Sequence, residues 1–142
     1  MTIELIIAIL GVVSAVITIS LTNYNSKKNQ MKFEERKLKE VYYTNFIDAV
    51  SYCVVSNNSE EARDKLADSQ NKLLLIGGSN VVFKLMIFHD YIKPSNSSFS
   101  SEKHDELLTD LIKTMREDLF LSSKINKDYP IIHLTGKNRT KK

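Results

Sequence analysis

The side chains best suited to metal or acid–base chemistry are scattered along this chain. His89, His104 and His133 stand far apart and form no HxxxH or HExxH pair, and Cys53 is the only cysteine. Zinc sites usually draw on closely spaced pairs of ligands, so a site built from these residues would need partners from distant segments. We interpret the histidines as surface or capping residues and expect no metal and no cofactor.

Paired carboxylates and glycine motifs do not indicate catalysis either. The acidic pairs 34–35, 60–61 and 105–106 fall at predicted helix starts or exposed faces, where charge is solvated or complements the helix dipole. The chain has no GxxxxGK[ST], GxGxxG or GxSxG motif. The amides of Gly77-Gly78-Ser79-Asn80 could hold an anion at a helix start, but an ordinary cap is favoured. The chain is therefore not expected to be an enzyme.

Two further features have simple interpretations. Cys53 lies within VSYCVV, which is typical of a small buried residue and not of a nucleophile. The C-terminal KNRTKK, residues 137–142, is basic but has no interleaved aromatic residue for base stacking. We interpret it as a disordered, solubilising or lipid-adjacent tail and expect no nucleic-acid partner.

One segment is apolar enough to cross a membrane. From Leu5 to Leu21 no residue is charged, and with Ile3 and Thr22 the stretch reaches 20 residues, which form about 30 Å of helix. A cleaved signal peptide is disfavoured because no basic residue precedes the apolar run, and a lipid-surface helix because there is no polar face. The sequence predicts a single-pass transmembrane anchor over residues 1–24.

Flanking charge predicts the orientation of this anchor. Lys27, Lys28 and Lys32 follow the span, and no Lys or Arg precedes it. The positive-inside rule places such lysines in the cytoplasm, so we expect an inner-membrane protein with its N-terminus outside and its domain in the cytoplasm. The same lysines form a basic group at the membrane surface, where each attracts anionic lipid by about 1 kcal/mol.

Small residues recur along one side of the anchor. They step by three and four, which places them on one helical face: Ala8, Gly11, Ala15, Thr18 and Thr22. Small faces let helix backbones approach one another in lipid, so we expect the anchor to self-associate through this packing face. The alternative is an oligomer contact within the cytoplasmic domain.

The remaining chain predicts a four-helix domain. An apolar stripe predicts a helix over about 26–55, nearly continuous with the anchor: Leu38, Tyr42, Phe46, Ala49 and Cys53. Ser59 and Ser79 are the expected N-caps of the second and third helices. Gly77-Gly78 is expected to end the second helix in a left-handed conformation, and Pro94 is expected to end the third. These helices are expected over 60–76 and 80–92.

A fourth helix is expected over 102–121. Its buried stripe contains Leu108, Leu111, Ile112, Met115 and Leu119. A short extended segment over 128–134 follows it. The predicted fold is therefore all-α: an anchor over 1–24, a helical cytoplasmic domain with this extended segment over 25–136, and the basic tail.

Arg116 and Asp118 border the stripe of the fourth helix near its C-terminal end. An unpaired carboxylate there opposes the helix dipole at a cost of about 0.3–1 kcal/mol. We therefore predict that Asp118 accepts bonds from backbone amides or a base after Leu121. Arg116 is expected to hold a carboxylate of another helix or carbonyls of the C-terminal segment, so that both residues fasten 129–134 to the bundle. The alternative is that Arg116 binds an anionic ligand.

Three stretches carry a resemblance: residues 40–46 (EVYYTNF), 72–82 (KLLLIGGSNVV) and 115–119 (MREDL). With them the chain resembles an uncharacterised family of small bacterial single-pass membrane proteins. In that family a helical domain follows a membrane helix and ends in an MRxDL-like motif. The resemblance covers about residues 33–134, and it implies an architecture but no catalytic residue.

The expected function is a non-catalytic, membrane-anchored interaction or scaffold module. Its expected partners are the lipid bilayer and a second copy of the chain or another protein, and no small-molecule substrate is identified. The alternative is a membrane-active, toxin-like effector whose transmembrane helix oligomerises and perturbs the bilayer. Dye leakage on induced expression would favour the effector, and harmless expression with a co-purifying protein would favour the module.

Overall fold

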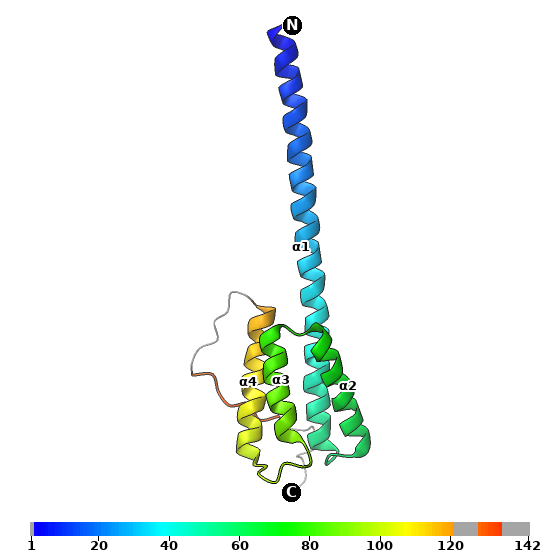
Figure 1. The fold of residues 1–142 in the computed structure, drawn as a ribbon, viewed down its shortest axis with the longest axis vertical. Helices are drawn as coiled ribbons and strands as arrows, with labels where there is room; N and C mark the ends of the chain where they lie inside the picture. Colours follow the sequence, from blue (N-terminus) through cyan, green and yellow to red (C-terminus); the bar gives the residue numbers. More distant parts are fainter. Residues whose placement is uncertain (1, 121–127, 135–142) are drawn as a thin grey trace. The chain divides into compact units, whose positions relative to one another are not determined.

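The computed structural model describes residues 2–120 and 128–134. Four helices follow one another, and no strand occurs in this part of the chain (Figure 1). They are α1 (Ile3–Val55), α2 (Glu60–Ile76), α3 (Ser79–Ile92) and α4 (Ser101–Leu119). The all-α prediction is confirmed, with a long apolar N-terminal helix followed by three more helices.

Helix α1 contains both the predicted anchor and the first helix of the predicted domain. It is unbroken from Ile3 to Val55 because it contains no proline, and its only glycine, Gly11, lies in the apolar stretch. That stretch is long and apolar enough to cross a membrane by length and composition, and none of it is buried. The chain divides into two compact units, Met1–Lys37 and Leu38–Lys142.

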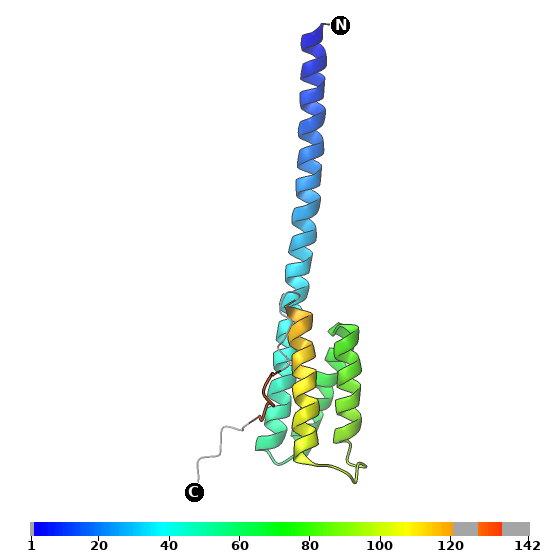
Figure 2. The ribbon, with the colours of Figure 1, turned by 90° about the vertical axis from the view of Figure 1, so that its left-hand side faces the viewer.

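The second unit is a four-helix bundle of the C-terminal part of α1 with α2, α3 and α4 (Figures 1 and 2). Helix α2 has 17 residues, about 25 Å of helix, and it turns back along α1 after Val55. It therefore covers α1 only back to about Leu38, where the unit begins.

The buried face of α1 differs from the predicted stripe. Phe46, Ala49 and Cys53 are buried as predicted, but Leu38 is 48% exposed and Tyr42 is only half-buried. Their places in the core are taken by Tyr43 and Val50. A stripe that steps by four drifts around a helix, whereas the observed series 43, 46, 50, 53 alternates three and four and stays on one face.

The other helices complete one hydrophobic core. The predicted stripe of α4 is confirmed, with Leu108, Leu111, Ile112 and Met115 buried and Leu119 packed against them. Helix α2 contributes Leu73, and α3 contributes three residues at helical spacing: Val81, Leu85 and Phe88. The rings of Phe46 and Phe88 meet edge to face with centroids 6.1 Å apart. This core fixes the rotation of each helix and so determines which polar side chains meet.

Caps and turns separate the helices. Ser59 caps α2 as predicted, its Oγ accepting a bond from the Ala62 N–H at 3.3 Å, and Ser100 caps α4 in the same way. The turn after α1 places Asn57 and Asn58 in the left-handed region, at φ 52° and 56°, which asparagine tolerates better than most residues.

The junction between α2 and α3 contradicts two capping predictions. Gly77 and Gly78 have φ of −64° and −61°, so neither is left-handed. Ser79 lies inside α3, and the N-cap is Gly78, with no side-chain cap bond. Position 78 has no room for a side chain, because another side chain approaches its backbone closely, as described below.

Residues 128–134, here called the C-terminal strap, lie along α4 without forming a helix or strand (Figure 2). The Ile132 N–H donates to Thr109 Oγ1 at 2.8 Å, and the side chains of Ile132 and Leu134 pack against the core. The predicted basic tail, 137–142, lies outside the described residues.

Candidate functional site

The Asp118 carboxylate joins α4 to α1. Its Oδ2 accepts a hydrogen bond from the Tyr43 hydroxyl at 2.6 Å and lies 3.1 Å from the Lys39 ammonium. The side chains of Lys39 and Asp118 are only 15% and 21% exposed, so water screens this ion pair less than a surface pair. Among the described residues the base that meets Asp118 comes from α1. The chain directly after Leu121, where we predicted backbone amides or a base for Asp118, lies outside the described residues.

The same carboxylate lies against the loop between α2 and α3. A Cβ built on Gly78 would come within 2.3 Å of Asp118 Oδ1, closer than any side chain can approach. Gly78 is the N-cap of α3, so the carboxylate stands at the positive end of the α3 dipole. It lies beside Gly78, in the turn where we weighed an anion site and favoured an ordinary cap.

These contacts bring together the three stretches that carry the resemblance. Tyr43 belongs to EVYYTNF, Gly78 to KLLLIGGSNVV and Asp118 to MREDL. Although 75 residues separate Tyr43 from Asp118, they form one hydrogen-bonded junction. We call this set, with Lys39, the Asp118 junction. Its contacts join α1, the α2–α3 loop and α4.

Arg116 faces the C-terminal strap. Its guanidinium lies 5.8 Å from the centroid of the Tyr129 ring, and Lys113 Nζ lies 5.1 Å from the same centroid. Cation–π contacts of this kind are worth about 0.5–1 kcal/mol at exposed sites. The contact of Arg116 with the strap is thus to an aromatic ring, whereas we predicted carbonyls or a carboxylate.

The strap is also held near the start of α4. Asp105 lies between two imidazoles, with His104 Nδ1 3.1 Å from Oδ1 and His133 Nδ1 2.5 Å from Oδ2. Burial acts to raise the pKa of Asp105, but the hydrogen bonds with His104 and His133 outweigh it and lower that pKa below its ordinary value. The ionised carboxylate is therefore the form that holds the strap.

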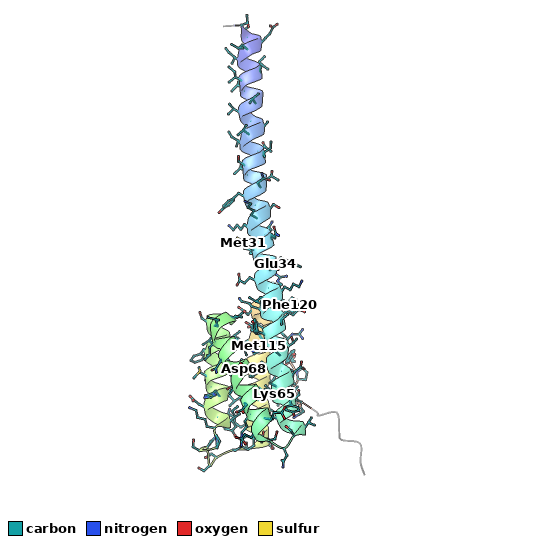
Figure 3. The ribbon with its side chains drawn as sticks, turned by 90° about the vertical axis from the view of Figure 1, so that its right-hand side faces the viewer. Met31, Glu34, Lys65, Asp68, Met115 and Phe120 are labelled. Atoms are coloured by element: carbon teal, nitrogen blue, oxygen red, sulfur yellow. The ribbon has the colours of Figure 1, made fainter. Side chains whose placement is uncertain are left out.

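The residues predicted at the membrane lie in the first unit and are all exposed on α1. They are the packing face Ala8, Gly11, Ala15, Thr18 and Thr22, and the basic group Lys27, Lys28 and Lys32. A Cβ on Gly11 would meet nothing within 4 Å, so that face is open. The hydroxyls of Thr18 and Thr22 donate to carbonyls of their own helix at 2.8 Å, as hydroxyls in a membrane-spanning helix would need to do. Figure 3 shows α1 of this unit with its side chains, including Met31 and Glu34.

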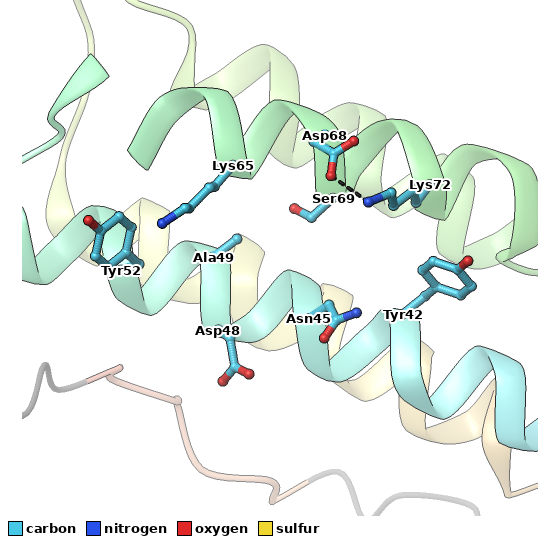
Figure 4. Close-up of a pocket in the computed structure, with 9 residues that line it drawn as sticks. All are labelled: Tyr42, Asn45, Asp48, Ala49, Tyr52, Lys65, Asp68, Ser69 and Lys72. Atoms are coloured by element: carbon cyan, nitrogen blue, oxygen red, sulfur yellow. Dashed lines mark hydrogen bonds and ion pairs between the residues drawn. The ribbon is translucent and has the colours of Figure 1, made fainter. Parts of the chain in front are cut away.

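Sequence reasoning missed a groove between α1 and α2. It has a volume of about 410 Å³ and is lined by Tyr42, Asn45, Asp48, Ala49, Tyr52, Lys65, Asp68, Ser69 and Lys72 (Figure 4). Lys72 Nζ lies 2.5 Å from Asp68 Oδ2, and Lys65 Nζ lies 4.4 Å above the Tyr52 ring and 2.7 Å from Glu61. Both ammonium groups thus have acidic partners within the domain. The sequence feature that could have predicted this groove is the pair of small side chains, Ala49 and Ser69, on facing sides of α1 and α2.

Residues with potential for redox or metal chemistry are inert or dispersed. The Cys53 thiol is buried and donates to the Ala62 carbonyl at 3.3 Å, and burial raises its pKa although Arg63 acts in the opposite direction. A raised pKa disfavours the thiolate, the form that reacts. Across residues 2–120 and 128–134, no group of three or more His, Cys, Asp or Glu side chains is placed to hold a metal ion.

Comparison of the chain with family models, with curated proteins and with solved structures finds no match. The family resemblance drawn from the three stretches stays a prediction. Function is therefore argued from the chain's own surfaces.

Proposed function

We propose that this protein is a membrane-anchored helical interaction module that presents its bundle at the cytoplasmic face of the membrane. The observation that carries the proposal is the N-terminal part of α1, which is apolar and has none of its side chains buried. In water such a helix would expose a long apolar surface at a large free-energy cost, whereas lipid covers it. One spanning helix also suits an adaptor that needs only a tether.

A second observation supports a binding role for the bundle. Helix α3 buries one apolar face in the core, yet Phe83, Met86 and Ile87 lie on its other side at spacings of three and one, with exposures of 63%, 41% and 37%. A helix that is apolar on both sides is usually covered on both sides. This face offers a contact for a partner.

The first test is topology. Alkaline carbonate should leave the protein in the membrane, and a C-terminal alkaline phosphatase fusion, active only outside the cytoplasm, should be silent. A matched control replaces Lys27, Lys28 and Lys32 with Gln and adds three lysines before Ile3, which should invert the protein and activate the reporter. Release by carbonate would refute the anchor, and an active wild-type fusion would refute the orientation.

The second test addresses self-association. The open face of small residues favours a second copy of the chain as the partner. Gly11→Ile with Ala15→Ile should reduce chemical cross-linking in membranes, because bulky residues keep the backbones apart. Val12→Ile with Val16→Ile adds apolar bulk off that face and should leave cross-linking unchanged. If both pairs behave alike, the contact lies elsewhere, and α3 becomes the next surface to substitute. Dye leakage on expression would instead favour the membrane-active effector.

A further inference from the structure

Two bases on α4 lack the acidic partner that other bases of the bundle have. Lysines throughout the bundle lie within 3.1 Å of a carboxylate oxygen: Lys39, Lys65, Lys72, Lys84, Lys93 and Lys103. Lys113 and Arg116 pair with no acid among the described residues, and both instead lie against the ring of Tyr129 in the C-terminal strap. The neighbouring acids in the sequence, Glu117 and Asp128, are exposed and form an ion pair with neither base.

The helix dipole accounts for only part of this arrangement. The dipole favours a base in the last turn of a helix, which explains Arg116, but Lys113 precedes the last turn of α4. Lys113 is half-buried, and taking an ammonium group out of water is costly when no acid compensates its charge. Two like charges three residues apart on a helix also repel each other. An anion held between Lys113 and Arg116 would relieve both costs.

A cavity beside Lys113 offers room for such an anion. It has a volume of about 320 Å³, lies between α4 and the strap, and is lined in part by Lys113 and Tyr129. Two carboxylates, those of Glu106 and Asp110, also line it. Both are compensated, because Lys103 Nζ lies 2.9 Å from Glu106 and Lys84 Nζ lies 2.6 Å from Asp110. The uncompensated charge in the described lining is therefore the positive charge of Lys113.

We propose that Lys113, Arg116 and Tyr129 form a binding site for a phosphate-bearing anion. A guanidinium donates two parallel hydrogen bonds to phosphate oxygens, and an ammonium adds a compact positive charge. Tyr129 lies against both bases and orients them, and the cavity takes the part of the ligand that carries the phosphate group. The site is built within the second unit, so it is independent of the anchor and goes beyond the proposed function. A lipid headgroup and a free phosphate compound share this chemistry.

Chemical modification of Lys113 tests the site. The full chain in a mild nonionic detergent is treated briefly with acetic anhydride, and mass spectrometry follows acetylation of Lys113 and of Lys93, a reference lysine outside the site. The first arm adds inorganic phosphate, against sodium chloride at the same ionic strength. The second arm adds phosphatidic acid to the micelles, against phosphatidylcholine. Bound phosphate should slow acetylation of Lys113 several-fold in at least one arm and leave Lys93 unchanged.

Two matched variants show whether the protection belongs to this site. Arg116→Gln should abolish the protection of Lys113, whereas Arg63→Gln, which removes the same charge from an exposed arginine of α2, should leave it intact. Protection by inorganic phosphate supports a free phosphate compound as the ligand, and protection by phosphatidic acid alone supports a lipid headgroup. Absence of protection in both arms would overturn the site. Equal protection of Lys93, equal slowing by sodium chloride, or protection that survives in Arg116→Gln would also overturn it.

Discussion

Replacing Gly78 with alanine should destabilise the bundle through Asp118, not through the backbone. Gly78 has φ −61° and ψ 158°, which alanine accepts without strain. The new Cβ, however, would stand 2.3 Å from Asp118 Oδ1, so the carboxylate must move. Movement disturbs the bond from Tyr43 at 2.6 Å and the ion pair with Lys39 at 3.1 Å.

The expected loss follows from those two contacts. A hydrogen bond to a charged group contributes about 1.5–3 kcal/mol, and a partly exposed ion pair contributes up to about 1 kcal/mol. Gly78→Ala should therefore lower the free energy of unfolding by about 1.5–4 kcal/mol. The measurement is urea unfolding of the full chain in mild detergent, followed by far-ultraviolet circular dichroism, with the urea dependence unchanged.

A double-mutant cycle supplies the control. Asp118→Ala removes the atoms that the new Cβ would meet, so in that background Gly78→Ala should be neutral or stabilise by about 0.4–1 kcal/mol, through reduced freedom of the unfolded chain. The two substitutions should thus be strongly non-additive. Equal losses from Gly78→Ala in the two backgrounds would show that Asp118 is not the cause and would refute the junction as described.

Four other substitutions, the last two as a matched pair, test three separate parts of the structure. Asp105→Asn should remove an acid-labile contribution: the folded pKa of Asp105 is lowered, so its stabilisation is complete above the ordinary pKa of 3.8 and declines as pH falls below it; unchanged acid unfolding curves would contradict this. Gln70→Met removes the contact of the amide oxygen with His89 Nδ1 at 3.0 Å, but it also removes the buried amide nitrogen, which has no partner among the described residues. The two effects oppose one another, so the unfolding free energy should change by less than about 1 kcal/mol; a larger loss in urea would contradict it. Leu85→Ala should cost about 2–5 kcal/mol, whereas Lys84→Met, which breaks a half-exposed ion pair with Asp110, should cost less than about 1 kcal/mol; similar thermal shifts for the two would contradict the assigned core.

Local patterns in the sequence determined the elements of this protein. The uncharged run from Leu5 to Leu21 predicted the apolar part of α1. Ser59 predicted the start of α2, and Pro94 predicted the end of α3. The apolar spacing of α4 also identified its buried face, Met115 included. These signals are readable because helix geometry, capping and hydrophobic periodicity depend only on residues a few positions apart.

The tertiary structure alone decided how those elements meet. The sequence placed Asp118 at the edge of a helix face but could not find its partners, because Tyr43 lies 75 residues away and the meeting depends on the rotation of two packed helices. Gly78 looked like a left-handed cap, yet its backbone is extended and its lack of a side chain serves the approach of a carboxylate. The exposed Leu38 likewise reflects the rotation of α1, whose buried face passes through Tyr43 and Phe46. Spacing along a chain fixes which residues share a face, whereas packing in three dimensions fixes what that face touches.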